Sequence, residues 1–158
     1  MDASSRVTSD NAGVMVPPPL IYVLFFLGGV VLQRYVPTAR LPSWTLLLAP
    51  VLIASWLMLT VWSFRRFWGA GTSIVPVRPS TTLVIEGPYR LTRNPMYVGM
   101  LFLYLGVACW SGLMWPLLLA PVLVWAIHVT VIGREERYLI RRFGDDYRRY
   151  QTQVRRWL

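Results

Sequence analysis

Three long stretches of the chain carry no charged side chain, and they limit what it can fold into. They cover residues 11–33, 41–64 and 94–133. A helix needs about 20 apolar residues to cross a hydrocarbon core of ~30 Å, so each of the first two is long enough to cross once. The third would reach roughly 60 Å as a single helix. We divide it at Ser111 and Gly112, which lie between tryptophans and are typical of a tight turn. The sequence therefore predicts an all-α integral membrane protein with four transmembrane helices.

The domain organisation follows from these stretches. A length of 158 residues suits one domain. Residues 17–158 are predicted to form it, and the polar residues 1–16 are predicted to be a disordered tail. We expect the first apolar stretch to be a retained helix rather than a signal peptide, because "VVLQRYV" lacks a small-residue cleavage pattern. The predicted helices cover about 17–35, 41–64, 95–110, 113–143 and 145–154.

The charge distribution predicts the orientation. The formal net charge is +9, and all sixteen basic residues are arginines. They flank the apolar stretches, which is the pattern of cytoplasmic loops in membrane proteins. With both termini inside, fourteen arginines lie in the cytoplasm and only Arg34 and Arg40 lie outside. The predicted partner is the lipid bilayer. A nucleic acid is not expected, since that would need a soluble basic face or a known binding module.

Cysteine usage narrows the classes of site. Cys109 is the single cysteine. It excludes an intrachain disulfide framework and a site of several cysteine ligands. No metal site is expected.

The segment "EGPYRLTRNPMY", residues 86–97, directly precedes the third apolar stretch. Asn94 followed by Pro95 predicts a helix start, because Asn can cap and proline is tolerated in the first turn. The free N–H groups and positive dipole end of such a helix attract anions, and Arg90 and Arg93 lie beside it. The segment suits a carboxylate or a phosphate. A capped membrane helix whose arginines only mark the cytoplasmic side is an equally open interpretation.

Glu135 and Glu136 form the second unusual feature. A helical carboxylate finds partners three or four positions away, and none of those positions is basic here. The partners of both glutamates are therefore expected in another element or in a ligand. His128, the only histidine, is seven residues before Glu135, so the two are predicted to share a helix face. A functional role for His128 and a helix–helix hydrogen bond both remain open.

The C-terminal segment is predicted to be helical and amphipathic. Its apolar residues follow steps of three and four, and Gly144 with Asp145 predicts a break between two helices. Its arginines are expected to face anionic lipid headgroups on the cytoplasmic side. We assign this role to four of them: Arg141, Arg142, Arg148 and Arg149.

Two motifs together resemble a known enzyme group. "GPYRLTRNPMYVG", followed some forty residues later by "REERYLIRRFGDDYRRY", is similar to the isoprenylcysteine carboxyl methyltransferases and phospholipid methyltransferases, which are integral membrane enzymes. The resemblance covers roughly residues 71–154. It implies that S-adenosylmethionine is the cofactor, held by the Arg-x-Pro segment and the glutamate pair. The residues so implied are Arg93, Asn94, Pro95, Tyr97, Gly99, Glu135 and Glu136.

The resemblance is less specific about the acceptor. Asn94 stands where prenylcysteine enzymes commonly have histidine. We expect a methyltransferase acting on a lipidic or prenyl-like acceptor, with carboxyl O-methylation favoured; a carboxylate needs no base, whereas an ammonium must first lose a proton. N-methylation of a phospholipid amine and a non-catalytic membrane binding or assembly protein are the alternatives. The candidate catalytic residues are Arg90, His128, Glu135 and Glu136, with Arg90 expected to orient an acceptor carboxylate.

Overall fold

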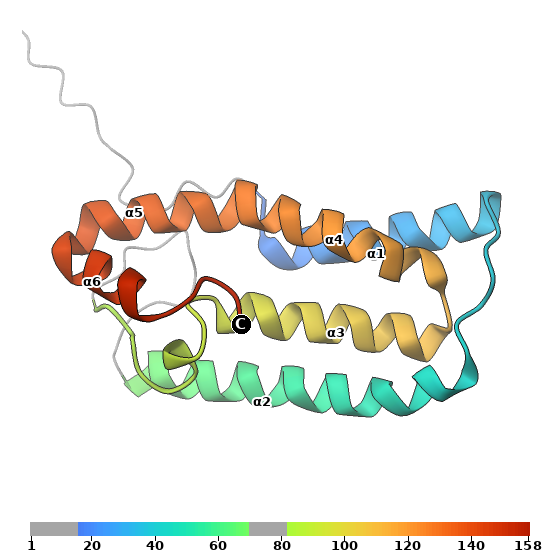
Figure 1. The fold of residues 1–158 in the computed structure, drawn as a ribbon, viewed down its shortest axis with the longest axis horizontal. Coiled ribbons are helices and arrows are strands. Elements are labelled where there is room, and N and C mark those ends of the chain that lie inside the picture. Colours follow the sequence, from blue (N-terminus) through green and yellow to red (C-terminus); the bar gives the residue numbers. More distant parts are fainter. Residues whose placement is uncertain (1–15, 70–81) are drawn as a thin grey trace, which may run out of the picture.

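The computed structural model describes residues 16–69 and 82–158. Every regular element in these two ranges is a helix, which confirms the all-α prediction. The elements, drawn in Figure 1, are α1 (Pro18–Tyr35), η1 (Ser43–Leu47), α2 (Leu48–Gly69), η2 (Gly87–Arg90), α3 (Pro95–Ser111), α4 (Met114–Ile127), η3 (His128–Ile132), α5 (Gly133–Phe143) and α6 (Asp145–Gln153). The predicted disordered tail, residues 1–16, lies outside the described residues except for Val16.

Three helical stretches are long and apolar enough to cross a membrane: Pro18–Tyr35, Ser43–Gly69 and Met114–Phe143. Helix α3 is also apolar, but its 17 residues make it shorter than these three. It ends at the predicted turn, where Gly112 adopts the left-handed conformation with φ 66°. Large apolar side chains on the outer faces of the other helices are exposed, which suits contact with lipid tails. They include Leu24, Leu57, Met58, Leu118 and Trp125.

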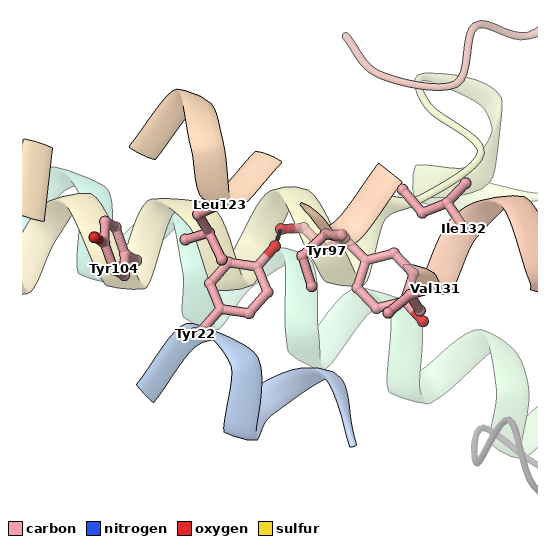
Figure 2. Packing of buried hydrophobic residues seen from close by; sticks show 7 residues of the cluster. Tyr22, Tyr97, Tyr104, Leu123, Val131 and Ile132 are labelled. Carbon is pink, nitrogen blue, oxygen red and sulfur yellow. Dashed lines mark hydrogen bonds between the residues drawn. The ribbon is translucent and has the colours of Figure 1, made fainter. Parts of the chain in front are cut away.

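Helix α3 occupies the middle of the bundle. It packs against α2 on one side and against α1 and α4 on the other (Figure 1). The main core lies on the second side and includes Tyr22, Tyr97, Leu123 and Ile127. The Tyr22 hydroxyl donates a hydrogen bond of 2.9 Å to the main-chain carbonyl of Tyr97 (Figure 2). The phenol of a buried tyrosine is thereby satisfied, and α1 is fastened to the first turn of α3.

Helices α2 and α3 approach most closely at Gly106. A Cβ atom there would lie 3.0 Å from Ile53 Cγ1 and 3.3 Å from the carbonyl oxygen of Ala49. At Gly99 the same addition would meet Leu59 Cβ at 3.6 Å, an ordinary van der Waals distance. Both glycines therefore face α2, but only Gly106 is needed for the spacing of the two helices.

We expect Gly106→Ala to be more destabilising than Gly99→Ala by about 1 kcal/mol, because only the first forces packed atoms apart. Both changes alter helix propensity equally, so this contribution cancels in the comparison. Thermal unfolding in detergent measures the difference. Equal melting temperatures for the two variants would contradict the close packing at Gly106.

The second half of the third apolar stretch forms α4 and η3, and this helical rod continues beyond the bundle as α5 (Figure 1). The sequence predicts a regular helix over 113–143, but residues His128–Ile132 form a π-helix. A π turn accommodates an extra residue and rotates everything after it. In the structure, Arg156 contacts both His128 and Glu136, which are eight residues apart. Glu135, seven residues after His128, contacts Tyr97 instead.

A second core lies at the polar end of the bundle. It contains Tyr89 of η2 together with Tyr147 and Tyr150 of α6. The Tyr150 hydroxyl donates a 2.6 Å hydrogen bond to the carbonyl of Tyr89. Gly87 begins η2 with φ 63°, and a Cβ there would lie 2.9 Å from Trp62 Nε1. This packing fixes the loop before α3 against both α2 and α6.

Candidate active site

The last five residues run from the end of α6 back to the start of α3 (Figure 1). We call residues 154–158 the C-terminal strap. The Arg93 amide donates to the carbonyl of Arg155 at 2.9 Å. Thr92 Oγ1 and Asn94 Nδ2 both donate to the carbonyl of Arg156, at 3.0 Å and 2.8 Å. The loop before α3 thus holds the strap through main-chain acceptors.

One side chain of the strap, Arg156, contacts a group of side chains from the bundle. We call these four residues the charged cluster: Arg93, His128, Glu136 and Arg156. Arg156 Nε donates to Glu136 Oε1 at 2.9 Å, and its Nη2 donates to Glu136 Oε2. Arg93 Nη2 lies 3.4 Å from Glu136 Oε1. Arg156 Nη1 donates to His128 Nε2 at 2.8 Å. Two guanidinium groups share one carboxylate, so the cluster keeps a positive charge.

Arg93 is the least satisfied member of the cluster. Its side chain is only 10% exposed. Its Nε and Nη1 atoms are buried, and neither has a hydrogen-bond partner among the described residues. Buried donors of a charged group are nearly always paired in native proteins, so two without partners call for an explanation. An anion bound beside them would supply the missing acceptors.

Glu135 points to a different neighbour. Its Oε1 accepts a 2.7 Å hydrogen bond from the hydroxyl of Tyr97. This bond ties α5 to α3, while the carbonyl of the same tyrosine binds Tyr22. Glu135 and Glu136, adjacent in sequence, therefore serve two different contacts. The partners come from other elements, as the absence of local basic residues predicts.

His128 presents a lone pair to Arg156. A guanidinium can only donate, so Nε2 is the acceptor and the ring proton lies on Nδ1. The indole N–H of Trp157 lies 3.4 Å from Nδ1. Two donors then face one another, and we interpret this contact as packing rather than as a hydrogen bond. In this arrangement the basic nitrogen of His128 is already engaged.

The remaining predicted site residues are placed as follows. Pro95 is buried in the first turn of α3, and Gly99 faces α2 rather than the cluster. Asn94 occupies the N-cap position, but its side chain makes no capping bond and binds the strap instead. The prediction that Asn94 caps the helix through its side chain is therefore wrong, because this side chain donates to the carbonyl of Arg156 instead. Arg90 is exposed at the end of η2, whereas the side chain of Arg93 is only 10% exposed.

Sequence reasoning missed Arg156 and Thr92. Arg156 lies twenty residues beyond Glu136 in a segment without regular structure, so no helical spacing connects the two. The hydrogen bond to Glu136 raises the pKa of the Arg156 guanidinium, which therefore stays charged. The available signal was the lack of local basic partners for Glu135 and Glu136, which predicts partners in another element or in a ligand.

This constellation can be compared with known proteins. A family model for phospholipid methyltransferases matches residues 44–146, which is more than half of the chain. The chain belongs to the phospholipid methyltransferase family. The match includes α2, α3 and α5, and with them Arg93, Glu135 and Glu136. Membership in a family of membrane methyltransferases agrees with the apolar helices.

Individual relatives match in shorter stretches. An uncharacterised protein of Haemophilus influenzae is 41% identical over 63 residues, which is 40% of this chain and all of that protein. A protein-S-isoprenylcysteine O-methyltransferase of Schizosaccharomyces pombe is 36% identical over 72 residues, covering 46% of this chain and 30% of the enzyme. Methanethiol S-methyltransferase 1 of Bradyrhizobium diazoefficiens is 35% identical over 89 residues, covering 53% of this chain and 27% of the enzyme.

The chain thus spans less than a third of the two relatives with named activities. No solved structure matches it at a comparable level of significance.

Proposed function

We propose that the chain is an S-adenosylmethionine-dependent membrane methyltransferase that methylates a carboxylate of a lipophilic acceptor. In this proposal, the bundle crosses the membrane four times, and both termini and the charged cluster lie on the cytoplasmic side. The cytoplasmic placement rests on the arginine distribution, which puts fourteen of sixteen arginines inside.

The observation that carries the proposal is the pair of unpartnered nitrogens on buried Arg93. The amino-acid part of S-adenosylmethionine has a carboxylate that fits these donors. It also has an ammonium group, for which Glu136 is the adjacent carboxylate. The start of α3 at Pro95 adds a positive dipole end beside them. The residues present therefore fit the donor.

The chemistry of transfer places few demands on the protein. When bound, S-adenosylmethionine would supply a methyl group on a sulfonium: the acceptor oxygen would bond to the methyl carbon in line as the carbon–sulfur bond breaks, and S-adenosylhomocysteine would leave. The protein's residues mainly bind and orient the two molecules. Arg93 and Glu136 would hold the donor. The hydrogen bond from Tyr97 of α3 to Glu135 of α5 holds these two helices together beside it.

Two of the candidate bases are already hydrogen-bonded, which favours an acceptor that needs no base. His128 Nε2 is engaged by Arg156, and both oxygens of Glu136 are engaged by arginines. Glu135 accepts a hydrogen bond from Tyr97 at Oε1, has no arginine bonded to it in the contacts of the charged cluster, and is the candidate base for an amine acceptor. The named activity of the fission-yeast relative, isoprenylcysteine O-methylation, also supports a carboxylate.

Methyl-labelled S-adenosylmethionine and a native lipid extract provide the test. We expect the purified protein to transfer label to a lipid-soluble product that releases volatile methanol in alkali, because methyl esters hydrolyse there. Label that resists alkali and depends on Glu135 would indicate N-methylation instead. No labelled product, together with no donor binding, would contradict the proposal.

The proposed topology makes a separate expectation. In a background of Cys109→Ala, which removes a buried thiol, Thr82→Cys and Ala39→Cys place exposed cysteines before η2 and between α1 and η1. An impermeant thiol reagent added outside intact cells should label Ala39→Cys and leave Thr82→Cys unlabelled until the cells are opened. The reverse pattern would overturn the orientation.

Arg90 remains the candidate for orienting an acceptor carboxylate. Its exposure outside the charged cluster separates it from the donor residues. We expect Arg90→Lys to lower turnover of an acidic acceptor about tenfold, because a lysine loses the bidentate geometry of guanidinium. Donor affinity should stay unchanged. Steady-state kinetics and donor titration distinguish this from a loss of donor binding, which would place Arg90 at the donor instead.

A further inference from the structure

Glu136 is already occupied by a cation from the protein itself. Arg156 of the C-terminal strap makes two hydrogen bonds to its carboxylate, one to each oxygen. A bidentate guanidinium–carboxylate pair is among the stronger polar contacts in proteins. Arg93 lies on the same carboxylate and has two unpartnered nitrogens. The two nitrogens of Arg93 that could bind an anion thus have no partner in the part of the chain that the structure describes, whereas Glu136, which could bind a cation, is already bound to Arg156.

An amino acid carries both charges on one carbon, so its carboxylate and ammonium must bind side by side. With the donor carboxylate on Arg93, its ammonium would come to the adjacent carboxylate, Glu136. The guanidinium of Arg156 holds that place in this structure. Full engagement of the donor therefore requires Arg156 to release Glu136.

The structure provides a route for this release. The side chain of Arg156 is 32% exposed, whereas those of Arg93 and Glu136 are only 10% and 9% exposed. Arg156 is therefore the member of the trio that reaches solvent. The strap itself is held by the carbonyls of Arg155 and Arg156, which accept from Arg93, Thr92 and Asn94. The side chain can leave while these main-chain bonds keep the strap in place.

We propose that Arg156 is an autoinhibitory residue that occupies the subsite for the donor's ammonium on Glu136 and is displaced when the donor binds. This inference rests on the proposed function. It makes the strap a built-in competitor, which lowers donor affinity in the resting protein.

Calorimetry with S-adenosylhomocysteine tests the competition, because this ligand keeps both amino-acid charges and cannot react. Arg156→Gln should bind it at least about tenfold more tightly than the unaltered protein, since a charged hydrogen-bonded pair no longer has to be broken. Arg156→Lys should fall between the two, because a lysine keeps the charge but loses the bidentate bond. An unchanged or weaker affinity in Arg156→Gln would overturn the proposal and make Arg156 a support for Glu136.

Two controls isolate the effect. Arg149→Gln removes the same charge from an exposed position on α6 and should leave the affinity unchanged. Methylthioadenosine lacks the amino-acid part, so its affinity should not respond to Arg156→Gln. A gain with this ligand as well would indicate a general opening of the site and contradict competition for Glu136.

The outcomes separate this inference from the proposed function. Thermal unfolding establishes that each variant is folded, and Arg156→Lys decides the question if Arg156→Gln does not fold. Binding by the unaltered protein with no gain in either variant leaves the proposed function standing and removes the inference. If neither the protein nor any variant binds S-adenosylhomocysteine, both fail.

Discussion

Glu136→Gln is expected to lower the free energy of unfolding by about 3 kcal/mol, because it removes the carboxylate that pairs with the largely buried guanidinium of Arg93. Arg93 is 10% exposed and meets its ion-pair partner at 3.4 Å. Without that anion it would remain charged and buried. Arg156 is less affected, since part of its side chain reaches solvent. Thermal or denaturant unfolding in detergent measures the loss.

Glu135→Gln is the matched control for this change. It is isosteric and adjacent, and its amide oxygen can still accept from Tyr97. We expect a loss below about 1 kcal/mol, the ordinary scale for one hydrogen bond of this kind. Equal destabilisation by the two substitutions would show that Glu136 is not the counter-ion of a buried arginine.

Arg93→Gln is expected to weaken binding of S-adenosylhomocysteine by more than about a hundredfold, as two charged hydrogen bonds to the donor carboxylate are lost. The fold should survive, because Glu136 keeps its bonds to Arg156. Methyl transfer should fall in parallel. Calorimetry and label transfer measure the two effects.

Arg90→Gln serves as the control for donor binding, since Arg90 is exposed three positions before Arg93. Its donor affinity should match that of the unaltered protein. If Arg93→Gln binds the donor normally, the unpartnered nitrogens of Arg93 in the unaltered protein have another explanation, and the donor site lies elsewhere.

The helical architecture was accessible from the sequence because a lipid environment leaves few choices. In hydrocarbon, the backbone N–H and C=O groups of a segment must hydrogen-bond to one another. A long stretch without charges that crosses the membrane is therefore expected to be a helix. The break at Ser111 and Gly112 was predicted from the excessive length of the third apolar stretch and from these two turn residues, and α3 ends there. The apolar pattern did not reveal the π-helix at His128–Ile132, because π-helices are rare and the pattern predicts a regular helix there. The structure shows that Glu136, and not Glu135, shares Arg156 as a partner with His128.

The candidate site divides in the same way. The sequence by itself determined that Glu135 and Glu136 need partners from outside their helix, that Asn94 and Pro95 begin a helix, and that the chain resembles membrane methyltransferases. These conclusions depend on local spacing and residue type. Only the tertiary structure decided that Glu136 binds Arg93 and Arg156 while Glu135 binds Tyr97. The physical reason is that an irregular strap has no periodicity, so its path across the loop follows from packing and main-chain hydrogen bonds.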